Sequence, residues 1–240
     1  MNGNYNMVKI IGVYFICCLR NYIEIVKEQL ECLNKGLLDK TDKLIIFITN
    51  YNKEKCVELD DILINYSNKL ILVKSEHNLF EKFAINNYKN YITETDYYLY
   101  YFHTKGLKDK NDPLFRVFSS RRKILDYYTL IQYDINIKLL EEYDAVGCSL
   151  HRYPKKHFSG NFWWSKSSYL QNLGKINDKY LSPEMYILSN NNCKFISLAN
   201  DTNCIYIENF SYPSKELIYK NLTNNIIDND EHKGLISLCE

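Results

Sequence analysis

The stretch YYLYYFHTKG at residues 97–106 predicts a buried β-strand that ends abruptly in a polar turn. Similar strand-forming runs precede it, and a helical pattern separates each run from the next. The predicted strands are 8–19, 43–49, 69–74 and 97–103, and the predicted helices between them are 22–38, 53–66 and 79–91. This repeated alternation predicts an α/β fold, with a mainly parallel sheet, helices on both faces and right-handed crossovers.

The second half of the chain opens with a long helical pattern that covers about residues 116–142. Further along we expect a strand at 143–150, a basic turn at 152–156, helices at 167–173 and 184–188, and strands at 194–199 and 204–207. No internal repeat and no Pro/Gly-rich linker interrupts the sequence. We therefore expect one domain over residues 1–220, followed by a polar C-terminal tail at 221–240.

The composition is that of a folded globular protein. Of the 240 residues, 46% are hydrophobic and 25% are charged, which excludes a disordered or fibrous class. The net charge of +1 gives no broad positive field. This argues against a nucleic-acid-binding protein, although a basic helix with nearby tyrosines would otherwise suit one.

The apolar run at 8–19 is too short to span a membrane and has no small-residue cleavage site, so it is interpreted as the first strand. We expect no transmembrane segment and a cytoplasmic location. The eight cysteines include no CxxC pair, so free thiols are expected and a structural zinc site is disfavoured.

A ligand site is predicted at the carboxyl ends of the first and fourth strands. In open α/β sheets, ligands bind where the strand order reverses, and these two strands are the usual neighbours there. The site then includes the turn residues His103, Thr104, Lys105 and Gly106, which offer an imidazole, a hydroxyl, an ammonium group and close backbone approach to a diphosphate. An ordinary turn at the end of a strand is the alternative interpretation.

Arg121 and Arg122 lie in the helical pattern that follows this turn, in the most basic stretch of the chain. A guanidinium group there can hold phosphate oxygens in a bidentate fork. Because the two side chains point in different directions from a helix, we expect only one of them to face the phosphates. A solvated helix face is the alternative.

The stretch HFSGNFWW at 157–164 contains both tryptophans of the chain. Indole faces pack well against pyranose rings, and polar side chains beside them can bind sugar hydroxyls. We therefore expect a sugar subsite, with packing of either tryptophan in a large core as the alternative. Its expected members are His157, Ser159, Gly160, Asn161, Trp163 and Trp164.

These motifs resemble a family of glycosyltransferase-like proteins found in bacterial polysaccharide clusters and in large DNA viruses. The similarity covers about residues 76–188 and includes YYLYYFHTKG, the arginine-led helix with Tyr127-Tyr128, YDAVG at 143–147 and HFSGNFWW. Glu81 and Glu184 match two further acidic positions of the family. The resemblance implies a Rossmann-like fold of the GT-A type and a UDP-, GDP- or dTDP-linked sugar donor. It also implies a glycan or glycoprotein acceptor in surface or virion glycan synthesis, in the host cytoplasm if the source is viral.

GT-A enzymes typically hold a divalent metal with an Asp-x-Asp after the fourth strand, where this chain has His-Thr-Lys. The only Asp-x-Asp is Asp228-Asn229-Asp230 in the polar tail. We therefore expect Lys105, with Arg121 or Arg122, to supply much of the positive charge. Mn²⁺ or Mg²⁺ remains an alternative, with His103 and a carboxylate as ligands.

Glu184 is the expected catalytic base, and Glu81 is expected to orient a neighbouring basic group. Lys105 and His157 complete the expected reaction centre. A surface or capping role is the alternative for each glutamate. The predicted function is glycosyl transfer from a nucleotide-diphosphate sugar to a hydroxyl acceptor, and the competing hypothesis is a non-catalytic carbohydrate- or nucleotide-sugar-binding module.

Overall fold

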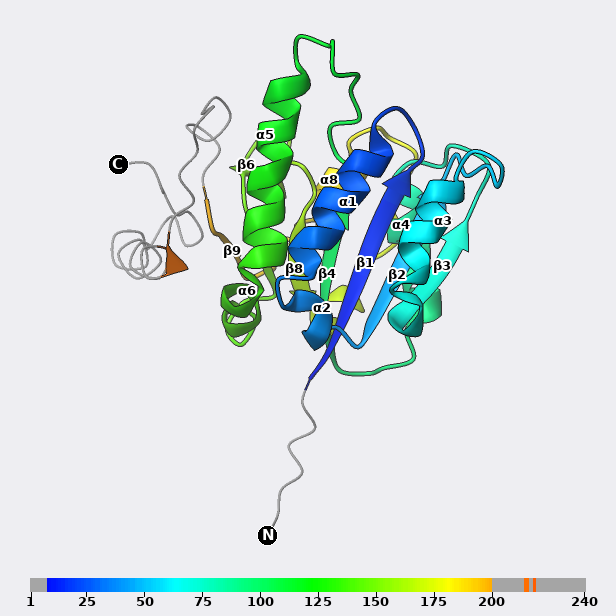
Figure 1. Ribbon diagram of the computed structural model, residues 1–240. Coiled ribbons are helices and arrows are strands. Elements are labelled where there is room, and N and C mark those ends of the chain that lie inside the picture. Colours follow the sequence, from blue (N-terminus) through cyan, green and yellow to red (C-terminus); the bar gives the residue numbers. More distant parts are fainter. Residues whose placement is uncertain (1–7, 200–213, 216–217, 219–240) are drawn as a thin grey trace.

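The computed structural model describes residues 8–199, 214, 215 and 218. Their main feature is a seven-stranded sheet of order β3-β2-β1-β4-β8-β5-β9, with helices on both faces (Figure 1). The strands are β1 (Lys9–Cys17), β2 (Lys43–Thr49), β3 (Leu70–Lys74), β4 (Tyr97–His103), β5 (Ala145–Gly147), β8 (Trp163–Lys166) and β9 (Phe195–Ser197). Neighbouring strands are parallel except at β8, which is antiparallel to both β4 and β5. The predicted α/β fold with a mainly parallel sheet in a single domain is confirmed.

Helices cover the two faces of the sheet unequally (Figure 1). One face carries α1 (Tyr22–Leu33), α2 (Leu37–Lys40), α3 (Val57–Ile64), α5 (Phe115–Asp126), the π-helix η3 (Tyr127–Ile131) and α6 (Tyr133–Leu139). The other face carries shorter elements, which are α4 (Lys82–Asn87), the 3₁₀ turn η2 (Tyr88–Tyr91), α7 (Ser167–Leu170) and α8 (Ser182–Met185). A 3₁₀ turn, η1 (Ser67–Lys69), precedes β3, and β6 (Leu150–His151) pairs with β7 (His157–Phe158) in a separate two-stranded sheet.

The central strands are buried on both faces, because their side chains alternate between two apolar cores. In β1, Tyr14 packs in the core under α1 and α5, whereas Val13 and Phe15 pack in the core under α4. Gly12 leaves space for the Tyr100 ring, since a Cβ at Gly12 would lie 2.5 Å from the Tyr100 hydroxyl oxygen. This double burial explains why the strands are nearly continuous apolar runs in the sequence.

The single long helix predicted over 116–142 is divided into α5, η3 and α6. Within the π turn, the carbonyl of Thr129 accepts a hydrogen bond from the Trp164 indole at 2.8 Å, and that of Tyr128 accepts one from the Asn136 amide at 2.7 Å. Side chains distant from the turn thus satisfy carbonyls that the altered helix geometry leaves available.

Other differences from the predicted elements lie in the second half of the chain. The strand predicted at 143–150 is shorter, because only Ala145–Gly147 pairs in the main sheet. The strand β8 within the aromatic run was not predicted. The helix expected at 184–188 is α8, which begins earlier, at Ser182, and ends earlier, at Met185. The strand predicted at 204–207 and the tail at 221–240 lie outside the described residues.

No helix in the described part of the chain is long and apolar enough to cross a membrane. The six cysteines in this part are free thiols.

Candidate functional site

The carboxyl ends of β1 and β4 lie side by side, at the point where the strand order reverses. The backbone N–H of Cys17 donates to the Thr104 hydroxyl at 3.0 Å, and the Arg20 guanidinium donates to the carbonyl of Leu107 at 3.0 Å. The two predicted edges of the cleft are therefore adjacent. However, Thr104 is only 4% exposed, and its hydroxyl joins β1 to the end of β4. The structure thus gives Thr104 a role in holding the strands together, in place of the predicted contact with substrate.

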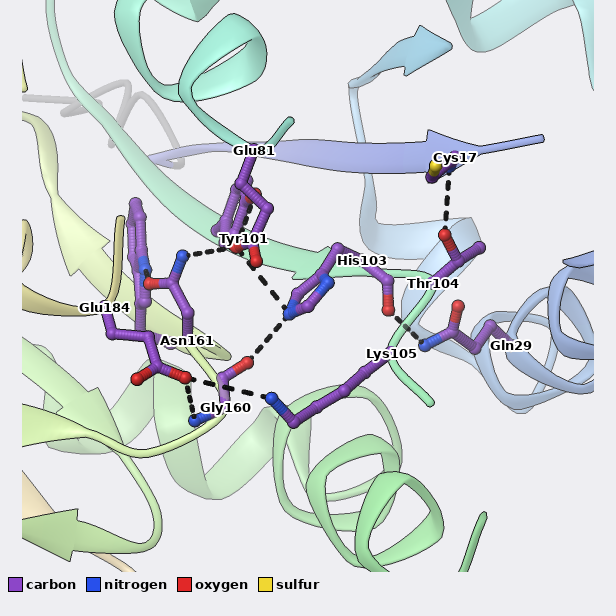
Figure 2. Close-up of polar contacts among 11 residues, drawn as sticks. Cys17, Gln29, Glu81, Tyr101, His103, Thr104, Lys105, Gly160, Asn161 and Glu184 are labelled. Atoms are coloured by element: carbon purple, nitrogen blue, oxygen red, sulfur yellow. Dashed lines mark hydrogen bonds and ion pairs between the residues drawn. The ribbon is translucent and has the colours of Figure 1, made fainter. Parts of the chain in front are cut away.

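The second motif reaches the same edge because β8 is antiparallel. The turn that precedes β8 therefore lies at the carboxyl end of β4, where the His103 Nε2–H donates to the carbonyl of Gly160 at 2.8 Å (Figure 2). Gly160 and Asn161 both have positive φ, at 99° and 56°. The two motifs quoted from the sequence are thus joined by a hydrogen bond between side chain and backbone.

The Glu81 carboxylate fixes the conformation of this turn. Its Oε2 accepts a hydrogen bond from the Asn161 amide at 2.7 Å and one from the Tyr101 hydroxyl at 3.2 Å, and it lies 3.7 Å from His103 Nε2. The Asn161 Oδ1 in turn accepts from the Trp163 indole at 2.9 Å. Glu81 therefore neighbours a basic group, as predicted.

The His103 imidazole is a hydrogen-bond donor in this arrangement. Burial lowers the pKa of its imidazole, and this outweighs the opposing effect of the Glu81 carboxylate. Because a carbonyl only accepts, the proton must be on Nε2, which faces Gly160. The sequence analysis predicted that the His103 imidazole binds substrate. Because Nε2 already donates to the Gly160 carbonyl, this nitrogen is not available for that contact.

The Glu184 carboxylate meets three groups from other elements. Its Oε1 accepts a hydrogen bond from the backbone N–H of Gly160 at 3.2 Å and lies 3.8 Å from Lys105 Nζ (Figure 2). Its Oε2 lies 3.8 Å from His157 Nε2. The His157 Nδ1–H donates to the carbonyl of Lys155 at 2.7 Å. The three residues predicted for the reaction centre, Glu184, Lys105 and His157, therefore lie together.

The two arginines face different surroundings. Arg121 is partly exposed and donates to the Ser159 hydroxyl, beside the Gly160 turn. Arg122 is 2% exposed and contacts the carboxylates of Glu28 and Asp126. The expectation that only one arginine faces the site agrees with this arrangement. Arg122 instead packs α5 against α1, which corrects its predicted role in binding substrate.

The tryptophans occupy the core, which corrects the predicted stacking on sugars. Both are fully buried in β8, and they point to opposite faces of the sheet. Trp163 stacks on Tyr101 with ring centroids 5.3 Å apart, and Trp164 packs against Tyr100. Neither indole presents a face to a ligand. Trp163 still contributes to the site indirectly, because its N–H holds the Asn161 side chain.

Two contributors to the site were not predicted. Tyr101 binds Glu81, and the Gln29 amide donates to the carbonyl of His103 at 3.1 Å and to the carboxylate of Asp126 at 2.8 Å. The available signal for Gln29 was its position on the apolar face of the α1 pattern, where a fully buried amide requires partners.

Comparison with known proteins identifies the family. A family model described as a domain of unknown function, DUF8361, matches residues 19–224. The chain belongs to this family. No curated protein matches its sequence.

The fold of this DUF8361 chain is similar to that of a solved mannosyltransferase, PcManGT from Pyrobaculum calidifontis, in complex with GDP-Man and Mn2+. The TM-score is 0.51 at 13% identity, and the match covers 92% of this chain but only 65% of the mannosyltransferase. Weaker similarities are to HddC from Yersinia pseudotuberculosis (TM-score 0.41, 16% identity, 77% of this chain and 88% of that chain) and to 4-diphosphocytidyl-2C-methyl-D-erythritol synthase from Anaerococcus prevotii (0.43, 12%, 92% and 97%). Only the first supports an argument, and it concerns the fold.

A metal ion at this edge of the DUF8361 chain would need a set of ligand side chains. Among residues 8–199, 214, 215 and 218, no group of three or more His, Cys, Asp or Glu side chains is placed to hold a metal ion. Glu81 already accepts hydrogen bonds from Asn161 and Tyr101, and Glu184 faces a lysine. Asp228 and Asp230 lie outside the described residues.

Proposed function

We propose that this chain is a glycosyltransferase that moves a sugar from a nucleotide-diphosphate sugar to a hydroxyl group of a glycan or glycoprotein. The observation that carries the proposal is the convergence of Lys105, Gly160, Glu81 and Glu184 at the carboxyl edge of β1 and β4. A cation, an aimed backbone N–H and two carboxylates are the groups that displacement of a nucleoside diphosphate by a hydroxyl requires. The fold shared with a GDP-mannose-bound mannosyltransferase supports the same class of donor.

The departing diphosphate carries the negative charge that develops in the reaction. Lys105 Nζ and the N–H of Gly160 lie on one side of the site, and the Arg121 guanidinium reaches the adjacent Ser159. These groups would stabilise the diphosphate, each through a charge or dipole fixed before the reaction begins. The Lys105 side chain is 19% exposed, so its charge is only partly screened by solvent.

Glu184 is the proposed base for the acceptor hydroxyl. Its side chain is 23% exposed, so it is accessible to an incoming hydroxyl. The acceptor O–H would form the new glycosidic bond through its oxygen while its proton passes to the carboxylate. A groove of about 710 Å³ borders α8 and is lined in part by Ser182, Met185 and Tyr186. We propose this groove as the place where the acceptor enters, since a volume of this size fits a small ligand.

Glu81 has a positioning role in this scheme. Its carboxylate is occupied by Asn161 and Tyr101 and holds the Gly160 turn in place. A glutamine at position 81 would keep the size of the side chain and remove its charge. Glu81→Gln is therefore expected to lower the affinity for the donor as well as the turnover rate.

The test is a thermal-shift screen of UDP-, GDP-, dTDP- and CMP-sugars, each with EDTA or Mn²⁺. A ligand that binds only the folded chain raises its melting temperature. One donor should stabilise the wild type and lose its effect with Lys105→Ala, but not with Lys110→Ala. Lys110 is the matched control, because its side chain is 68% exposed and pairs with Glu24, whereas Lys105 faces Glu184.

The competing function is a non-catalytic module that binds nucleotide sugars or carbohydrate. It is favoured by the absence of a three-ligand metal group among the described residues. Release of nucleoside diphosphate from the stabilising donor separates the two functions. Turnover that is lost with Glu184→Gln supports the transferase, whereas stabilisation without any release supports the module.

A further inference from the structure

Glu184 is held in a manner typical of a bound anion. One of its carboxylate oxygens accepts from the N–H of Gly160 at 3.2 Å and lies 3.8 Å from Lys105 Nζ (Figure 2). The other lies 3.8 Å from His157 Nε2. A backbone donor, an ammonium group and an imidazole thus surround one carboxylate. None of these groups belongs to the same element as Glu184.

The same three groups would suit a phosphate at least as well. Glycine backbones with positive φ aim their N–H groups outward and commonly bind anions, and Gly160 has φ of 99°. Lysine binds phosphate as a point charge. His157 contributes its Nε2 to the same point, and its ring is held in place because Nδ1 donates to the Lys155 carbonyl.

The element that carries Glu184 is weakly attached. The helix α8 spans only Ser182–Met185, and none of its residues is buried. The chain becomes firmly packed only after it, at Tyr186 and Ile187, which are 3% and 0% exposed. A groove of about 710 Å³ is lined in part by Ser182 and Met185 of α8, so this short helix borders open space into which it can move.

We infer that the site formed by Gly160, Lys105 and His157 is a phosphate-binding site, which the Glu184 carboxylate occupies in the absence of ligand. A bound phosphate group displaces Glu184, and α8 moves toward the groove. This inference rests on the proposed function and extends it, because it identifies which groups bind the diphosphate and what competes with it. A carboxylate and a phosphate cannot share this site, since like charges so close together repel strongly.

The displacement also couples donor binding to the chemistry. While Glu184 is paired with Lys105, its lone pairs are directed to the Gly160 N–H and the ammonium group. Once displaced, the carboxylate is available to accept the proton of an acceptor hydroxyl. The carboxylate would then act as a base only when a donor is present.

Calorimetric titration with inorganic pyrophosphate, in a buffer free of phosphate, tests the inference directly. Glu184→Gln keeps the size of the side chain and removes its charge, so pyrophosphate should bind about tenfold more tightly than to the wild type, a difference of about 1.4 kcal/mol. Glu141→Gln is the matched control, because it removes the same charge from an exposed position that precedes β5, at the opposite edge of the sheet from the site. It should leave the affinity unchanged.

A second pair of titrations locates the bound pyrophosphate. Adding Lys105→Ala to the wild type and to the Glu184→Gln variant should weaken binding at least tenfold in both. The inference is overturned if Glu184→Gln binds pyrophosphate no more tightly than the wild type, or if Lys105→Ala has no effect in either chain.

Because pyrophosphate carries no sugar or nucleoside, this result is independent of the donor screen. Tighter pyrophosphate binding without stabilisation by any nucleotide sugar would retain the phosphate site and reject the glycosyltransferase. Stabilisation by a nucleotide sugar, with no tighter binding of pyrophosphate by Glu184→Gln, would retain the glycosyltransferase and reject the phosphate site.

Discussion

Replacing each tryptophan of β8 by phenylalanine separates its role in packing from its role at the site. Both side chains are fully buried, and each indole N–H has one acceptor, Asn161 Oδ1 for Trp163 and the Thr129 carbonyl for Trp164. Truncation of the ring leaves a cavity, and the unpaired buried acceptor adds a cost of about 1–3 kcal/mol. We expect each variant to lose about 2–5 kcal/mol of unfolding free energy in urea titrations, which a domain of ordinary stability survives.

The two variants should differ in ligand binding. Trp163→Phe frees the Asn161 side chain, which together with Glu81 holds the Gly160 turn. Loss of one hydrogen bond of about 1 kcal/mol from this support should weaken pyrophosphate or donor binding about fivefold. Trp164→Phe lies on the other face of the sheet and should leave the affinity unchanged. Equal affinities for two folded variants would refute the positioning role of Trp163, and a loss of affinity in Trp164→Phe alone would contradict the hydrogen-bond pathway described above.

Three further changes test the site and its support. Lys105→Ala should reduce nucleotide-diphosphate affinity at least tenfold in calorimetry without lowering the melting temperature. Lys110→Ala should change neither quantity. A melting temperature lowered by Lys105→Ala would indicate that this lysine has a structural role. Gly160→Ala should destabilise the chain by about 1–3 kcal/mol and abolish anion binding, because φ is 99° and the new Cβ would lie 2.6 Å from Leu125 Cδ1. Full anion binding by this variant would show that the Gly160 turn is not part of the site. Burial raises the pKa of Asp126 from 3.8 to about 7, against the opposing Gln29 hydrogen bond. The folded chain then binds the extra proton, so the contribution of Asp126 to the unfolding free energy is most favourable below pH 4 and falls by up to about 1.4 kcal/mol per pH unit toward pH 7. Asp126→Asn should flatten this slope in urea titrations at pH 5 and pH 7, and an unchanged slope would show that Asp126 is ionised throughout.

The central strands could be predicted from the sequence because they are buried on both faces. The predicted strands at 43–49 and 97–103 coincide with β2 and β4 residue for residue. Such strands are continuous apolar runs with polar residues at each end, and no distant contact is needed to recognise them. Their order along the chain was also enough to place the carboxyl end of β4 beside that of β1.

The strand β8 could not be recognised in this way. It spans only Trp163–Lys166 and follows a Ser-Gly-Asn turn, so the local pattern favoured a sugar subsite with aromatic side chains. The polar groups of this stretch do have buried partners, but these are supplied by Glu81 and Thr129, which are far away in the sequence. Long-range hydrogen bonds of this kind leave no local periodicity to detect.

The residues of the site were easier to predict than their roles. His103, Lys105, Gly160 and Glu184 were expected at the site, and the structure brings them together. Arg122 was misassigned because its burial depends on carboxylates of α1 and α5 that meet only in the folded chain.

The alternation of Trp163 and Trp164 between the two cores also determines where this chain can change in length. One residue inserted between Asn161 and Trp163 would exchange the faces of the two indoles and detach the turn from Glu81. Residues 152–156, just before the motif, are exposed throughout. Natural or designed variation in loop length should therefore accumulate before His157, where it can reshape the entrance to the site while the spacing from Gly160 to the sheet stays constant.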